Sequence, residues 1–165
     1  MLDQGADINA RGSTTKYPID QAIFGGNLKA ADKLLELHAK FSGEALAEAV
    51  DYETKEYLVS ELLKRGADPN TEHERQGNML QLAISKGCQE STIRALLEAG
   101  ADVNAVEGEY GTALQAAVYR KEENTVRLLF EHGAKVNLPT CGEFGNPLQI
   151  AVSSKLEPQI GRAHV

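Results

Sequence analysis

Two short phrases recur along this chain, and their shared period constrains the fold more than any other feature of the sequence. The first phrase reads LLKRGADPN at 62–70, LLEAGADVN at 96–104 and LLFEHGAKVN at 128–137. Its tail opens the chain as GADIN at 5–9, and a degenerate copy ends at Ala39. The alanines of successive copies lie 33, 28, 34 and 33 residues apart. Because similarity at a fixed period of this length is the signature of a repeat architecture, we predict an array of stacked units rather than one globule.

The second phrase keeps the same register. Complete copies are GNMLQLA at 77–83, GTALQAA at 111–117 and GNPLQIA at 145–151, and weaker copies lie at 17–22 and 44–49. In each complete copy an Asn or Thr precedes a short apolar run. The side-chain oxygen of such a residue can accept a hydrogen bond from the free N–H groups at the start of a helix. The second phrase therefore predicts the first helix of each unit.

The first phrase predicts a second helix and its end. Its Leu-Leu pair places apolar side chains on one helix face, and a glycine follows where a left-handed conformation ends the helix without a Cβ penalty. These glycines are Gly66, Gly100 and Gly133. Gly26-Asn27 and Gly87 predict the turns between paired helices. The polar segment 104–111 predicts a projecting loop or hairpin between units.

This period and arrangement resemble the ankyrin repeat, whose signature is Thr-Pro-Leu-His followed one residue later by Ala. Here Gln81, Gln115 and Gln149 replace the signature His. The resemblance covers residues 1 to about 155 and implies an all-α solenoid of stacked helix-turn-helix units with projecting loops or hairpins. The string YGTALQAA at 110–117 is similar to a variant common in ankyrin arrays of filamentous fungi, which implies a fungal source.

The register divides the chain into units. They are the end of a truncated repeat at 1–10, repeats at 11–43, 44–76, 77–110 and 111–144, and the start of a truncated repeat at 145–159. The 28-residue spacing around Phe41 predicts that the repeat at 44–76 has lost most of the loop that precedes it. His38 stands where glycine usually ends the helix, so we expect that junction to be strained or rebuilt.

Both ends of the array are expected to be cut. Repeat arrays normally end in units with a polar outer face, and the sequence shows no such cap at either end. Residues 160–165, IGRAHV, break the pattern and match one reading frame of a widely used sequencing-adapter oligonucleotide. We interpret them as a non-native tail left by cloning or sequencing; a natural irregular tail is the alternative.

The charge balance disfavours several classes of partner. Seventeen Lys and Arg stand against 24 Asp and Glu, which gives a net charge of −7. Such a surface repels phosphate, so we expect no nucleic-acid partner. No apolar run approaches the length needed to span a bilayer, so we expect no membrane insertion. Cys88 and Cys141 are far apart and are expected to be reduced thiols, which favours the cytoplasm or nucleus. We expect the chain to be a monomer.

The sequence offers no catalytic constellation. The four histidines, at 38, 73, 132 and 164, follow no metal-ligand spacing and are expected to have structural or surface roles. The glycines at 142–145 lack the Lys of a phosphate-binding loop. No serine has a partner spaced as a general base. We therefore expect a non-enzyme without a cofactor or metal.

The resemblance implies a binding surface. In ankyrin arrays the loop tips and the exposed side of each first helix form a concave face where partners commonly dock. By register, the matching positions are Arg75, Gln76, Ser85, Lys86, Glu109, Tyr110, Tyr119, Arg120, Glu143, Phe144, Ser153 and Ser154. Tyr, Phe and Arg are types that contribute strongly to interfaces. The alternative is that Tyr110 and Phe144 only pack neighbouring loops together.

Two functions are compatible with these features. The first is a non-catalytic module that binds a protein partner, of an identity the sequence does not give, through the concave face. The alternative is a regulatory segment of a larger enzyme or nucleotide-binding signalling protein, in which the array packs against its own chain. Full-length sequence distinguishes them, because a phosphate-binding loop upstream favours the alternative.

Overall fold

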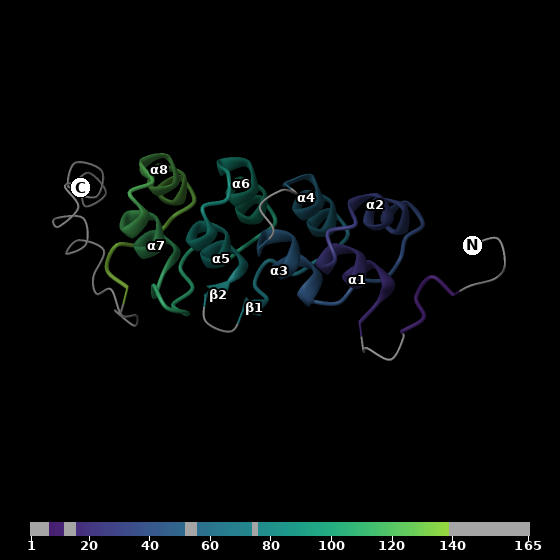
Figure 1. Ribbon diagram of the computed structural model, residues 1–165. Helices are drawn as coiled ribbons and strands as arrows, with labels where there is room; N and C mark the ends of the chain where they lie inside the picture. The colour runs from purple at the N-terminus through teal and green to yellow at the C-terminus, as the bar shows by residue number, and fades with distance from the viewer. Residues whose placement is uncertain (1–6, 12–15, 52–55, 74–75, 139–165) are drawn as a thin grey trace.

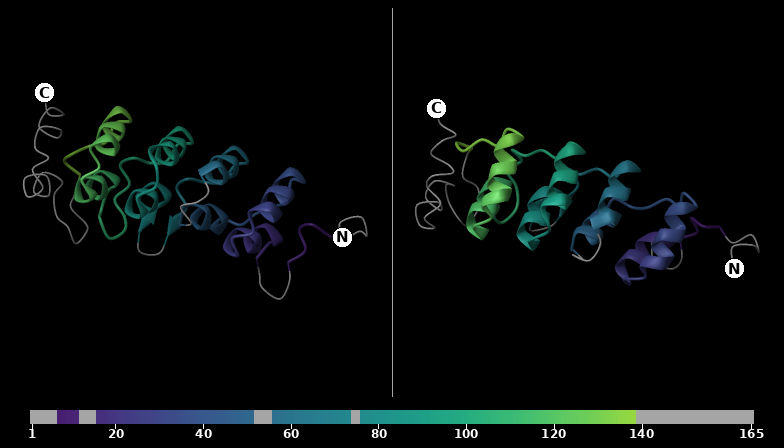
Figure 2. Two further views of the ribbon diagram at one scale, coloured as in Figure 1. Left: turned by 45° about the horizontal axis from the view of Figure 1, so that its top comes forward. Right: turned by 90° about the horizontal axis from the view of Figure 1, so that it is seen from above.

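The helices pair and stack in a row. The computed structural model describes residues 7–11, 16–51, 56–73 and 76–138 (Figure 1). Within these ranges the pairs are α1 (Pro18–Phe24) with α2 (Leu28–Glu36), α3 (Glu44–Asp51) with α4 (Glu56–Lys64), α5 (Met79–Lys86) with α6 (Glu90–Glu98), and α7 (Ala113–Arg120) with α8 (Glu123–Glu131). Figure 2 shows the pairs side by side from two further directions. The prediction of an all-α solenoid is confirmed.

Two rows of helices share one continuous core. In the first row α1 contacts α3, α3 contacts α5, and α5 contacts α7; in the second row α4 contacts α6, and α6 contacts α8. Residues 79–84 of α5 and 113–118 of α7 are all buried, and each of these helices packs against a first-row neighbour and against its own partner. The second-row helices bury only one face, such as Leu58 and Leu62 of α4. Each unit completes the core of the next, as expected for a solenoid.

The predicted starts and ends of helices are confirmed. Asn78 Oδ1 accepts a hydrogen bond from Gln81 N at 3.0 Å, and Thr112 Oγ1 accepts one from Gln115 N at 3.1 Å. The glycines that end the second helices have φ values in the left-handed region. These values are +90° at Gly66, +92° at Gly100 and +85° at Gly133. Local rules of capping therefore hold at these units.

Two residues other than glycine adopt the left-handed conformation. His38 has a φ of 57°, so the strained junction predicted from its place in the register is present. Its Nδ1 lies 3.2 Å from Arg65 Nη1. Lys121 has a φ of 62° in the turn between α7 and α8, where α5 and α6 are joined through Gly87. The sequence did not predict the strain at Lys121.

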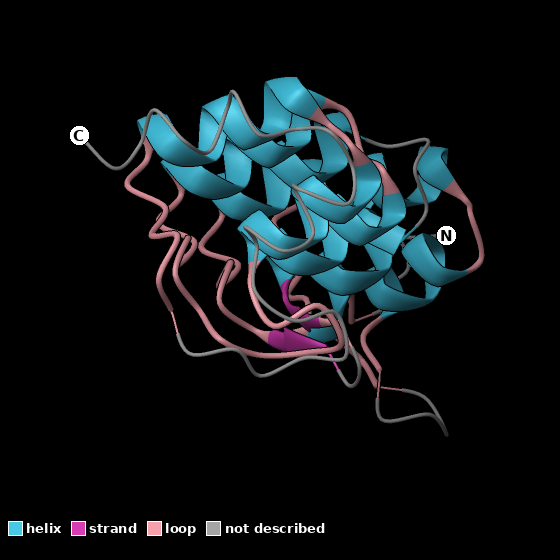
Figure 3. Cartoon of the chain, turned by 90° about the vertical axis from the view of Figure 1, so that its left-hand side faces the viewer, coloured by secondary structure: helices cyan, strands magenta, loops and turns pink. Residues whose placement is uncertain are grey.

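Projecting loops lie on one side of the helices (Figure 3). We call the connection between α4 and α5 finger 3; it carries the antiparallel strands β1 (Glu72–His73) and β2 (Gly77–Asn78). The connection between α6 and α7 is finger 4, and it is closed by a bridge between Glu107 and Gly111. Between α2 and α3 the chain crosses directly through residues 37–43. The predicted loss of a loop at this junction therefore matches the helix boundaries.

The asparagine that ends the first phrase joins neighbouring units. Asn70 Oδ1 accepts from Asp102 N at 2.7 Å, and Asn70 Nδ2 donates to Gly100 O at 3.1 Å. Asn104 repeats the arrangement one unit later, with Lys135 N at 2.8 Å and Gly133 O at 3.1 Å. This asparagine therefore recurs because its side chain forms hydrogen bonds to the next unit.

Candidate functional site

One face of the array combines the fingers with the last turns of the first-row helices. Since the earlier turns of α5 and α7 are buried, only their last residues can reach a partner. Phe24 at the end of α1 is 54% exposed, and Tyr119 near the end of α7 is 47% exposed. We call this surface the inner face. It is the surface on which the ankyrin resemblance placed the binding residues.

A buried glutamine fixes finger 4 to α5. Gln81 is buried, with only 1% of its surface exposed. Its Oε1 accepts a hydrogen bond from Asn78 N at 2.9 Å. Its Nε2 donates to the carbonyl oxygens of Ala105, Glu107 and Gly111 at 3.3, 3.0 and 3.1 Å. One amide therefore caps its own helix and holds the next finger. From the sequence alone, the replacement of the signature His by glutamine gave no indication of this contact.

Arg120 braces two units instead of projecting freely. Its Nη1 donates to Ser85 O at 3.0 Å, across the junction between α7 and α5, and its Nε pairs with Glu122 Oε1 at 2.7 Å. The guanidinium lies so close to Gly87 that a side chain there would meet it. Lys86 is likewise engaged, in an ion pair with Asp51 of the preceding unit. Both predicted binding residues thus have intramolecular partners.

Replacing Arg120 with Ala is expected to lower the free energy of unfolding by about 1 kcal/mol, because one charge-assisted hydrogen bond and one partly exposed ion pair are lost. Urea denaturation followed by circular dichroism measures the change. Arg127→Ala is the matched control, since Arg127 is an exposed arginine on α8. An equal effect of the two substitutions would show that the contact with Ser85 contributes nothing.

Two tyrosines form an aromatic cluster on the inner face. The rings of Tyr110, in finger 4, and Tyr119, in α7, have centroids 5.5 Å apart at 48°. Tyr110 is half-buried, and burial together with the nearby Glu109 carboxylate raises the pKa of its hydroxyl. Glu109 itself is exposed. Tyr110 therefore packs on the first helix of the following unit, and Tyr119 presents the larger exposed surface.

Two further residues singled out from the sequence each have a close polar neighbour, and the others lie outside the described residues. Gln76 is half-buried in finger 3, and its Oε1 lies 2.9 Å from His73 Nδ1. His132 Nδ1 lies 2.9 Å from Leu128 O. The predicted features outside the described residues are Arg75, Glu143, Phe144, Ser153, Ser154, Cys141, His164, the truncated repeat at 145–159 and the tail at 160–165.

A groove crosses the inner face beside α3. Its lining comes from α1, α3 and finger 3: Phe24, Glu44, Ala47, Glu48, Asp51, Thr71, Glu72 and His73. It has a volume of about 490 Å³ and is partly open to solvent. We call it the α3 groove. Its residues were not among the predicted binding positions, although the 28-residue spacing marked this junction as unusual.

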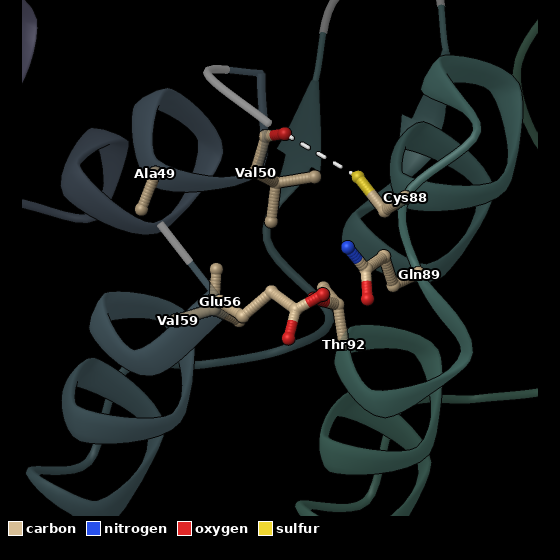
Figure 4. Close-up of a pocket in the computed structure, with 7 residues that line it drawn as sticks. All are labelled: Ala49, Val50, Glu56, Val59, Cys88, Gln89 and Thr92. Atoms are coloured by element: carbon tan, nitrogen blue, oxygen red, sulfur yellow. Dashed lines mark hydrogen bonds between the residues drawn. The ribbon is translucent and has the colours of Figure 1, made fainter. Parts of the chain in front are cut away.

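A much smaller cavity lies between the second and third helix pairs (Figure 4). It measures about 10 Å³, room for about one water molecule, and is lined by Ala49, Val50, Glu56, Val59, Cys88, Gln89 and Thr92. The buried Cys88 Sγ donates to Val50 O at 3.5 Å. This cavity is a packing feature of the junction and is too small for an organic ligand.

Among the described residues, no group of three His, Cys, Asp or Glu side chains could hold a metal ion. In the same part of the chain, no helix combines the length and the apolar character needed to cross a membrane.

Comparison with known proteins agrees with the geometry. The family model for ankyrin repeats (3 copies) matches residues 46–140 and, in an overlapping match, residues 80–157. No curated protein matches the chain significantly.

Proposed function

The chain belongs to the ankyrin-repeat family, and we propose that it is a non-catalytic module that binds a partner protein through its inner face, the concave face of such arrays. Ankyrin repeats generally mediate protein–protein interaction, and ankyrin domains are typically non-catalytic. The observation that carries the choice of face is Tyr119. Tyr119 follows the buried residues Ala113 to Val118 of α7. Nearly half of its surface is exposed, and its ring lies beside that of Tyr110.

This arrangement suits recognition for physical reasons. A tyrosine backed by another ring loses little conformational freedom when a partner covers it, and its hydroxyl can form a hydrogen bond at the rim. The braces at Lys86 and Arg120 hold the first-row helices at fixed spacing, so the face is organised before binding. We propose that the array acts as a monomer in the cytoplasm or nucleus.

Tyr119→Ala is expected to weaken partner binding by roughly tenfold or more, the usual effect of removing a central aromatic contact. A partner isolated by affinity capture supplies the ligand, and isothermal titration calorimetry measures the Kd. Arg127→Ala on α8 provides the matched control on the opposite row. The choice of face would be contradicted if Tyr119→Ala left the affinity unchanged while substitutions on the second-row helices weakened binding.

A further inference from the structure

The α3 groove arises from two departures of one unit from the repeat. No finger precedes α3, because residues 37–43 connect α2 to α3 directly. In addition, Ala47 occupies the register that Gln81 occupies in the next unit. Gln81 binds the carbonyls of Ala105 and Glu107, and the equivalent residues of finger 3 are Thr71 and His73. A methyl group cannot reach them, so the space between α3 and finger 3 stays open as the groove.

The groove walls combine carboxylates with an exposed aromatic ring. Glu44, Glu48 and Asp51 line it from α3, and Glu72 lines it from finger 3. Asp51 is paired with Lys86, and Phe24 closes the α1 side with more than half of its surface exposed. Such a surface attracts cations and repels phosphate. The same ring can also accept the aliphatic stem of a long cationic side chain.

A lysine of the protein itself already contacts three of the residues that line the α3 groove. The Lys16 ammonium lies 3.0 Å from Glu44 Oε2 and 3.9 Å from Glu48 Oε1. The same nitrogen lies 5.4 Å from the centre of the Phe24 ring. The hydrogen bond to Glu44 raises the pKa of Lys16, so the ammonium stays charged. Two carboxylates and one ring therefore already hold a lysine head group.

We propose that the α3 groove binds an extended segment of a partner protein that carries lysine or arginine, and that a cationic side chain of this segment replaces Lys16 between Glu44, Glu48 and Phe24. This proposal rests on the proposed function and adds the chemical class of the partner. The segment runs towards Glu72, which gives a second cation a carboxylate partner on finger 3. Lys16 acts as an internal competitor for the site.

The test uses a fluorescein-labelled synthetic peptide, Gly-Lys-Leu-Lys-Arg-Leu-Gly, and the same peptide with acetyl-lysine and citrulline in place of its cations. Fluorescence anisotropy with the full chain is expected to show saturable binding of the first peptide only.

Glu44→Gln with Glu48→Gln is expected to weaken binding of the first peptide by roughly three- to tenfold, the size expected for two exposed ion pairs. Phe24→Ala is expected to weaken it as well. Lys16→Met is expected to strengthen it by roughly twofold or more, because the competitor is gone.

The control removes the same charge elsewhere. Glu98→Gln with Glu131→Gln neutralises two exposed carboxylates on α6 and α8 and is expected to leave peptide affinity nearly unchanged. Thermal melts establish that each variant is folded. Equal weakening by both double variants, weaker binding by Lys16→Met, or no saturable binding would each overturn the proposal. Because the peptide is added directly, such a failure leaves the effect of Tyr119→Ala on the captured partner, and hence the proposed function, intact.

Discussion

Replacing Gln81 with Leu is expected to lower the free energy of unfolding by roughly 2–4 kcal/mol, because a buried amide that serves four backbone groups is lost. Leucine has a similar volume, so packing is largely kept while the hydrogen bonds vanish. Gly111 O retains its bond from Glu107 N at 2.8 Å. The carbonyls of Ala105 and Glu107 lose the amide donor, and Asn78 N loses its acceptor.

Urea denaturation measures the global effect, and hydrogen exchange of the amides at 105–111 measures the release of finger 4. Gln81→His restores the residue of the family signature and is the matched variant, since an imidazole N–H can donate to one of the carbonyls. It is expected to keep part of the stability that Leu loses. If Gln81→Leu stays within about 0.5 kcal/mol of the parent chain, as surface substitutions do, the clamp does not hold the finger.

Features governed by local chemistry were predictable from the sequence. The caps at Asn78 and Thr112 and the glycine that ends α6 each depend on a few consecutive residues, so the repeated phrases were enough to predict them. The strain at His38 followed in the same way, because a side chain occupied a glycine position. The period supplied the stacking of units, since a unit alone cannot bury its apolar face.

Features that depend on neighbouring units were not predictable. Asn104 bonds atoms about 30 residues away, and no local rule connects them. Arg120 was predicted as a binding residue from its type and register, but the direction of its guanidinium depends on Ser85 O in the unit before. The α3 groove depends on the short side chain of Ala47, which cannot reach finger 3. This consequence follows only once the position of finger 3 beside α3 is known.

Gly108→Ala is expected to lower the free energy of unfolding by about 3 kcal/mol, or to displace finger 4 from finger 3, because the two fingers touch through backbone at this residue. A Cβ there would lie 2.5 Å from Gly77 N and 2.6 Å from Gln76 O. Neither atom belongs to a side chain that could rotate away. The φ of +67° adds the cost of a left-handed alanine, about 1 kcal/mol.

Gly100→Ala separates these two contributions. Gly100 has a φ of +92°, but a Cβ at this position meets nothing within 4 Å. It is therefore expected to cost about 1 kcal/mol through conformation alone, and the difference between the two variants, measured by urea denaturation, reports the contact between fingers. Equal losses would mean that the fingers are not held against each other. If the inner face binds a partner as proposed, Gly108→Ala should also weaken that binding more than Gly100→Ala does, because only the former moves the finger that carries Tyr110.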